Sequence, residues 1–79
     1  MNNLEIERLK IILSKVFSGS TLPEDISNLK LGDLDEWDSL GNFNLLLGVE
    51  DEFSIKFDIE EMAVIKSIKE ILIFLKSRR

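Results

Sequence analysis

The chain has 79 residues, of which 44% are hydrophobic and 32% charged, and its formal net charge is −5. This size predicts a single domain over residues 1–79 with one small core. The sequence contains neither cysteine nor histidine, which excludes disulfides and removes the commonest general base and metal ligand. We therefore expect a protein that is not an autonomous enzyme and holds no metal.

The charges are segregated along the chain. Residues 24–61 hold 12 of the 15 acidic residues but only two of the ten basic ones, a net of −10, while the two flanks together carry +5. An acidic middle predicts basic partners and repels nucleic acid. Solubility alone is the alternative explanation of such a composition.

No apolar run in the sequence approaches the length that crosses a bilayer. The first residues, Met1-Asn2-Asn3-Leu4-Glu5, lack the basic region of a secretory signal. We therefore expect a cytoplasmic, monomeric protein without a membrane span.

The first part of the chain predicts an amphipathic helix. Asn2 or Asn3 is the expected N-cap, with Glu5 near the positive end of the helix dipole. Gly19, within Ser18-Gly19-Ser20, is expected to end the helix in the left-handed conformation. The apolar residues that recur at three- and four-residue steps are Leu9, Ile12, Leu13, Val16 and Phe17.

A long connection follows, over residues 20–37. Pro23 and Gly32 discourage a continuous helix there, and its length indicates either a functional or a disordered segment. Five apolar residues favour order, so we expect an ordered loop pinned across the bundle, with one helical turn near residues 25–29. These apolar residues are Leu22, Ile26, Leu29, Leu31 and Leu34.

Asp38 is a good N-cap for a second helix and places Ser39 in its first turn, with the side chain pointing outward. A phosphate on the Ser39 oxygen would lie where backbone N–H groups and the helix dipole favour an anion. The alternative is that Ser39 is an ordinary residue of a helix start.

The second helix carries two apolar stripes on opposite sides. The stripe of Leu45, Leu46, Val49 and Phe53 suits a core, whereas a second stripe either packs under the long loop or stays exposed for a partner. We favour a partner surface because the second stripe begins beside Ser39. It consists of Leu40, Phe43 and Leu47.

Gly41 and Gly48 lie on a further side of the same helix. Each glycine destabilises a helix interior by roughly 1 kcal/mol relative to alanine. A compensating reason for their presence is that another group approaches the helix closely at these positions. We expect that approach to be made by a partner or an attached group, in which case Gly41→Ala would stabilise the fold and weaken function.

The remaining chain predicts two more helices. Asp58 with Glu61 has the capping-box spacing for a short helix near residues 59–64, and Ser67 with Glu70 has the same spacing for a last helix. The predicted fold is therefore all-α: a four-helix bundle of three main helices, one short helix and a long first loop. The last helix is expected to face inward with Ile68, Ile71, Leu72 and Leu75, widened by Ile73 and Phe74, and to end in Lys76, Arg78 and Arg79.

Four motifs stand in register over about residues 33–73: Asp38-Ser39-Leu40, Glu50-Asp51-Glu52, Phe53-x-Ile55 and Ile65-x-Ser67-Ile68. Together they resemble the motifs of acyl carrier proteins. This resemblance implies a small acyl-carrier-like bundle in which Ser39 is esterified by 4′-phosphopantetheine from coenzyme A. It also implies that the residue at Asp38 assists modification through a metal at the modifying enzyme's interface.

The resemblance implies a carrier that holds acyl groups as thioesters on the arm, as in fatty acid or polyketide biosynthesis. The implied partners are a holo-synthase (phosphopantetheinyl transferase), an acyl-loading ligase or acyltransferase, and downstream synthases or transferases. A solvated face is the alternative role for the three carboxylates among the candidate partner-binding residues. The candidates are Leu40, Phe43, Leu47, Glu50, Asp51 and Glu52.

Departures from the family pattern leave alternatives open. Gly41, Asn42 and Asn44 stand where fatty-acid carriers usually have carboxylates, and Trp37 with Asn44-Leu45 is similar to stand-alone carriers of specialised pathways. A peptidyl or D-alanyl carrier and an unmodified helical interaction module remain alternatives. A calcium loop is not supported, because the required glycine and glutamate are missing after the three candidate ligands. Those ligands would be Asp33, Asp35 and Asp38.

Overall fold

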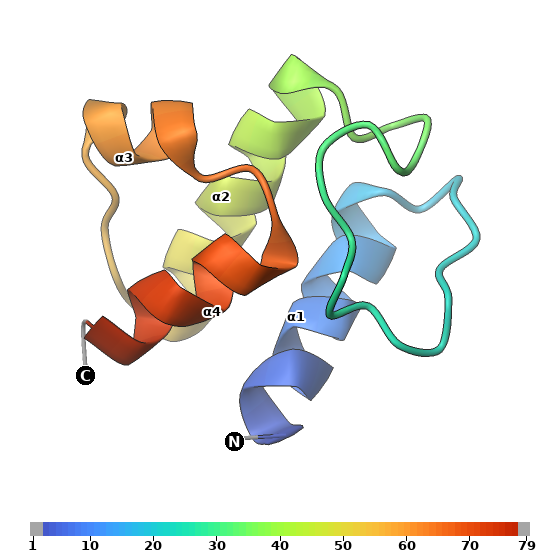
Figure 1. The fold of residues 1–79 in the computed structure, drawn as a ribbon, viewed down its shortest axis with the longest axis horizontal. Helices are drawn as coiled ribbons and strands as arrows, with labels where there is room; N and C mark the ends of the chain where they lie inside the picture. Colours follow the sequence, from blue (N-terminus) through green and yellow to red (C-terminus); the bar gives the residue numbers. More distant parts are fainter. Residues whose placement is uncertain (1–2, 78–79) are drawn as a thin grey trace.

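The computed structural model describes residues 3–77. This part of the chain folds into four helices, α1 (Asn3–Val16), α2 (Ser39–Phe53), α3 (Ile59–Val64) and α4 (Ile68–Ser77). A long loop joins α1 to α2 and runs beside α1 (Figure 1). The prediction of an all-α bundle with three main helices, one short helix and a long first loop is confirmed.

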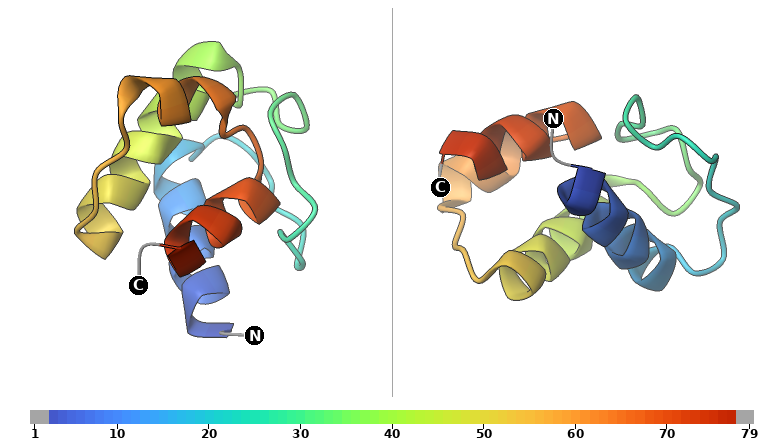
Figure 2. Two further views of the ribbon diagram at one scale, coloured as in Figure 1. Left: turned by 60° about the vertical axis from the view of Figure 1, so that its left-hand side comes forward. Right: turned by 90° about the horizontal axis from the view of Figure 1, so that it is seen from below.

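The core lies where α1, α2 and α4 meet. α1 packs along α2, and α4 lies on one side of that pair (Figure 2). The inward residues predicted for α1 are buried, apart from the half-buried Val16. Fully buried side chains come from all three helices and from the loop: Leu9, Leu13, Phe17, Ile26, Trp37, Leu45, Leu46, Val49, Ile68, Ile71 and Leu75.

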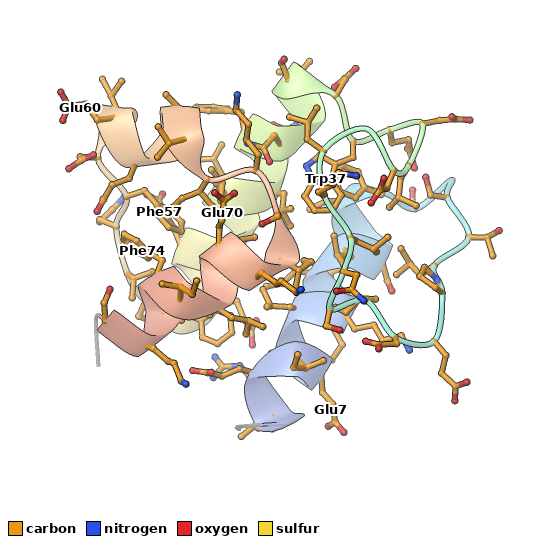
Figure 3. The ribbon with its side chains drawn as sticks, viewed as in Figure 1. Glu7, Trp37, Phe57, Glu60, Glu70 and Phe74 are labelled. Carbon is orange, nitrogen blue, oxygen red and sulfur yellow. The ribbon has the colours of Figure 1, made fainter. Side chains whose placement is uncertain are left out.

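The prediction that Ile73 of α4 faces inward is wrong. Ile73 is 67% exposed, because it follows the buried Ile71 by two residues, about 200° around the helix. Phe74 is buried as predicted and packs on Phe57, with ring centroids 4.5 Å apart (Figure 3). Lys76 lies in the last turn of α4, whereas Arg78 and Arg79 are outside the described residues.

The end of α1 differs from the prediction. Within residues 3–77, positive φ angles occur only at Gly32 and Ser54, so Gly19 is not left-handed. Its N–H instead donates to Oε1 of Glu36 at 3.0 Å, and the Ser20 hydroxyl donates to the same oxygen. A carboxylate from the long loop thus replaces the glycine cap. The N-cap predicted at Asn2 or Asn3 concerns side chains outside the described part.

Backbone hydrogen bonds pin the long loop to the α3–α4 connection. Leu31 N–H donates to the Lys66 carbonyl at 2.8 Å, and Ile68 N–H donates to the Leu29 carbonyl at 3.0 Å. These bonds flank an isolated antiparallel bridge. The predicted ordered loop therefore crosses the bundle, and its middle is bonded to the connection between α3 and α4.

The helical turn expected near residues 25–29 is a single turn, closed by Leu29 N–H donating to the Ile26 carbonyl at 3.0 Å. Hydrogen bonds from the Ser27 hydroxyl and N–H hold the pKa of the exposed Asp25 carboxyl below its ordinary value. The buried Ile26 anchors this turn in the core.

The capping box predicted for α3 is confirmed, whereas α4 shows only the half in which Ser67 caps the Glu70 N–H. Glu61 N–H donates to Asp58 Oδ1 at 2.8 Å, and Asp58 N–H donates to Glu61 Oε1 at 2.9 Å, which completes a capping box. At α4, Glu70 N–H donates to the Ser67 hydroxyl, while the Glu70 carboxylate accepts from the N–H of Lys66.

The two glycines of α2 face the rest of the bundle, so the expectation that they admit a partner is wrong. A Cβ on Gly41 would overlap the Glu36 carbonyl oxygen and lie 3.0 Å from Cε1 of Phe17. A Cβ on Gly48 would lie 3.0 Å from Cγ2 of Ile12. Both glycines permit close packing within the molecule, against the loop and α1.

We therefore expect Gly41→Ala to destabilise the fold, the reverse of the expectation from helix propensity. Because the added methyl meets backbone, we expect overpacking to lower the free energy of unfolding by about 1–3 kcal/mol. Urea unfolding measures this change. Asn44→Ala, at an exposed position of α2, is the control and should change stability by less than about 1 kcal/mol; a Gly41→Ala protein as stable as wild type would contradict this packing.

Candidate functional site

The first turn of α2 is built by Asp38. This residue has extended backbone angles, and its Oδ1 accepts the Gly41 N–H at 2.8 Å, while its carbonyl accepts the N–H of Asn42. The predicted N-cap is thereby confirmed. The cap fixes where α2 begins, and hence where the next residue lies.

Ser39 is the first residue of α2 and is exposed. Within residues 3–77, no side chain or backbone group forms a hydrogen bond with its hydroxyl, and the following Leu40 is 68% exposed. The hydroxyl oxygen is therefore accessible to another protein. Because Asp38 accepts the N–H groups of Gly41 and Asn42, the first-turn N–H groups without a hydrogen bond in the described residues are those of Ser39 and Leu40.

A groove of about 360 Å³ begins at Ser39 and runs between α2 and α3. Sequence reasoning missed this groove, although the apolar residues of α3 recur at the spacing of one helix face. α3 contributes no buried residue, so these side chains are available to line a surface. The lining consists of Leu31, Ser39, Asn42, Phe43, Ile59, Met62, Ala63 and Lys66.

The second apolar stripe of α2 is exposed over its length. Leu40, Phe43 and Leu47 are 68%, 47% and 42% exposed. The long loop therefore leaves this stripe largely open. It borders the groove at Phe43, so the stripe and the groove form one continuous apolar surface beside Ser39.

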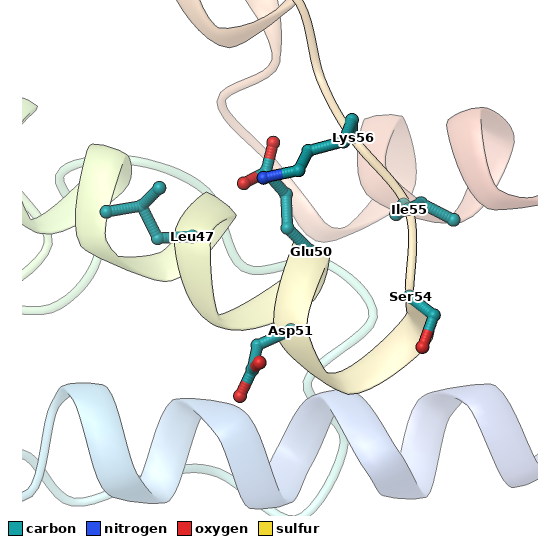
Figure 4. Close-up of a pocket in the computed structure, with 6 residues that line it drawn as sticks. All are labelled: Leu47, Glu50, Asp51, Ser54, Ile55 and Lys56. Carbon is teal, nitrogen blue, oxygen red and sulfur yellow. The ribbon is translucent and has the colours of Figure 1, made fainter.

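The three predicted docking carboxylates have different surroundings. Glu50 is half-buried and accepts the Phe57 N–H at 2.7 Å, and its carboxylate points toward Lys56 (Figure 4). Glu52 accepts from Nε of Arg8 at 2.9 Å. Asp51 is exposed, and its carboxylate forms no hydrogen bond or ion pair within the described residues.

Arg8 ties the start of α1 to the end of α2. Besides its ion pair, its guanidinium donates to the Glu52 carbonyl at 2.6 Å and lies 4.2 Å from the centroid of the Phe53 ring. Two of the three carboxylates thus support the fold, which leaves Asp51 as the carboxylate best placed to meet a partner. It borders two surface hollows, one of about 400 Å³ beside Leu47 (Figure 4) and one against α1.

Neither a metal site nor a membrane helix is found in the described part of the chain. Residues 3–77 contain no group of three or more acidic side chains placed to hold a metal ion. Asp33, once a candidate calcium ligand, accepts from the N–H and the ammonium of Lys30. Over the same residues, every helix is too short or too polar to cross a membrane.

Comparisons with protein-family models, with curated proteins and with solved structures find no match to this chain. The assignment of a role to Ser39 therefore depends on the chemistry of its surroundings. Those surroundings combine an exposed hydroxyl, a capped helix start, an apolar groove and an acidic surface.

We expect the cap at Asp38 to be measurable apart from any function. Asp38→Ala should lower the free energy of unfolding by about 1 kcal/mol because the Gly41 N–H loses its acceptor. Asp38→Asn retains an oxygen at the same place and should stay within about 0.5 kcal/mol of wild type. Thermal or urea unfolding of the three proteins gives the comparison, and equal stabilities of the Ala and Asn variants would contradict the cap.

Proposed function

We propose that this chain is a carrier protein and not an enzyme, with Ser39 as the attachment point of a 4′-phosphopantetheine arm. The observation that carries the proposal is the exposed Ser39 hydroxyl at the capped start of α2, within the motif Asp38-Ser39-Leu40. The arm would supply a thiol that holds acyl groups as thioesters. In this view the protein works in the cytoplasm and delivers its cargo to successive enzymes.

The residues around Ser39 fit such an arm. On modification, the Ser39 oxygen loses its proton and bonds to the pantetheine phosphate of coenzyme A, and the adenosine bisphosphate half leaves. The unpaired N–H groups of the first turn favour a phosphate there, and Lys66 lines the same groove. Asp38 is exposed, so solvent and salt screen its repulsion of the phosphate.

The apolar groove suits the remainder of the arm. Ile59, Met62 and Ala63 line it from α3, and such a surface can shelter the uncharged pantetheine part without a buried charge. The physical benefit of a tethered cargo is effective concentration, because a docked enzyme meets it intramolecularly. The loading partner would be a ligase or acyltransferase, and the modifying partner a holo-synthase.

The proposal is tested by weighing the protein after incubation with coenzyme A and a promiscuous holo-synthase. We expect the wild-type mass to increase by one phosphopantetheine, and Ser39→Ala to remain unmodified. Ser18→Ala, which removes another exposed serine, is the matched control and should be modified like the wild type. An unmodified wild type, or a modified Ser39→Ala, would refute the attachment at Ser39.

The exposed stripe of Leu40, Phe43 and Leu47 favours a second candidate, an unmodified helical interaction module. The same experiment separates the two functions. A module of this kind gains no mass, and its binding to a partner survives Ser39→Ala. A peptidyl or D-alanyl carrier would be modified at Ser39 and would differ only in its cargo.

Docking of the holo-synthase should weaken as ionic strength rises, because the acidic surface is exposed and salt screens exposed charges. Asp51→Asn should weaken docking by at most about fivefold, the range of an exposed ion pair, and leave stability unchanged. Glu52→Gln should also lower stability, since it breaks the pair with Arg8. Binding titrations at several salt concentrations provide the measurement; docking that ignores salt would place recognition on the apolar stripe.

A further inference from the structure

Asn42 is a polar residue buried in the first turns of α2, where it is 5% exposed. Its Oδ1 accepts the indole N–H of Trp37 at 2.9 Å, and its Nδ2 donates to the Ile65 carbonyl at 2.9 Å. The Trp37 indole N–H, the Asn42 side-chain amide and the Ile65 carbonyl are therefore all hydrogen-bonded within the interior. The amide joins the loop before Ser39 to the end of α3.

Asparagine suits this position because the link needs one acceptor and one donor on the same short side chain. Aspartate would keep the acceptor for Trp37 but direct a carboxylate oxygen at the Ile65 carbonyl. Leucine would leave both the indole N–H and the carbonyl unpaired, at a cost of about 1–3 kcal/mol for each buried group. The residue at position 42 must therefore carry both a donor and an acceptor, in addition to having a suitable volume.

The link matters because α3 has few other anchors. None of its six residues is buried, and Ile59 at its start is 85% exposed. Its end is held at Ile65, whose side chain is buried and whose N–H closes the last turn on the Glu61 carbonyl. The bond from Asn42 to the Ile65 carbonyl holds that end to α2, next to the Lys66 carbonyl that accepts the Leu31 N–H of the long loop.

The other half of the link reaches Phe17, the residue that follows α1. Trp37 is fully buried and stacks on Phe17, with ring centroids 5.6 Å apart and planes inclined by 26°. Trp37 and Asn42 lie two residues before and three residues after Ser39. The turn that contains Ser39 is therefore held by Trp37 before it and by Asn42 after it. The hydrogen bonds of Asn42 connect this turn to the end of α3.

We propose that Asn42 is a positioning residue that sets the spacing between Ser39 and α3, and thereby the width of the groove that begins at Ser39. This role rests on the proposed carrier function, since the groove and Ser39 must meet a modifying enzyme together. Asn42 does not touch the reacting oxygen. It acts through the Ile65 carbonyl and the Trp37 indole.

The test compares wild type with Asn42→Asp and Trp37→Phe, and uses Asn44→Asp as the matched control. Asn44 is exposed on the same helix, so its variant adds the same charge without cutting the link. Amide hydrogen exchange is followed at Met62 and Ile65, whose N–H groups bond within α3, and at Phe17, whose N–H bonds to the Leu13 carbonyl of α1.

We expect Asn42→Asp to accelerate exchange at Met62 and Ile65 by about tenfold or more relative to Phe17, because it releases the end of α3. Modification of the apo-protein by the holo-synthase should show a KM raised about three- to tenfold with kcat little changed, since the Ser39 chemistry is intact. Asn44→Asp should change neither quantity by more than about twofold.

A merely structural role predicts a different pattern. Exchange would then accelerate equally at α1 and α3, and KM would stay at the wild-type value below the unfolding temperature. Either of those results would overturn the positioning role. If Asn42→Asp does not fold, Trp37→Phe decides the question. It removes the indole N–H together with part of the buried ring, and it should accelerate exchange at Met62 and Ile65 about threefold more than at Phe17. An equal change at these sites would again overturn the proposal.

The positioning role and the carrier function can fail separately. A wild type that gains no phosphopantetheine refutes the carrier function, while selective acceleration of α3 in Asn42→Asp would still support the link. A wild type that is modified, with no selective effect in the Asn42 and Trp37 variants, refutes the positioning role alone.

Discussion

The close approach of residues 36–37 to both α1 and α2 is the contact on which the remaining structure depends. The Glu36 backbone passes against Gly41, its carboxylate holds the end of α1, and the neighbouring Trp37 fills the space between the helices. Backbone packed this closely tolerates no side chain at Gly41. Residues 36–37 therefore separate the two helices and fix where α2 begins relative to α1.

The acidic side chains near the site differ in role: some stabilise the fold, whereas Asp51 is exposed on the surface. Hydrogen bonds from other residues of the chain are accepted by Glu36, Glu50 and Glu52. These carboxylates therefore help to hold loops and helix ends in place. Asp51 remains on the surface without such a bond in the described residues. An acidic composition thus overstates the number of carboxylates that are free for recognition, because local pairing fixes some of them in place.

Helices, caps and buried stripes were predictable because they depend on local spacing. The bounds of α3 and the capping box of Asp58 follow from short-range chemistry, and so does the outward stripe of α2. Apart from Ile73, whose outward position follows from the helical turn alone, the errors lie where distant segments meet. The role of Gly41 and the end of α1 at Gly19 are each decided by a residue of another element, and no periodicity reports such a partner. The burial of Asn42, which no sequence pattern predicted, is likewise decided by residues outside α2. The accessibility of Ser39 was predictable, whereas the groove beside it required the placement of α3.

The burial of Trp37 has an optical consequence. The chain contains a single tryptophan and no tyrosine, so its near-ultraviolet absorption and its emission come almost entirely from one ring. That chromophore is sealed from water and stacked on Phe17, two residues from the oxygen at the start of α2. Any event that loosens this turn exposes the ring to solvent, and the emission should then shift to longer wavelength, so the molecule carries its own fluorescent reporter.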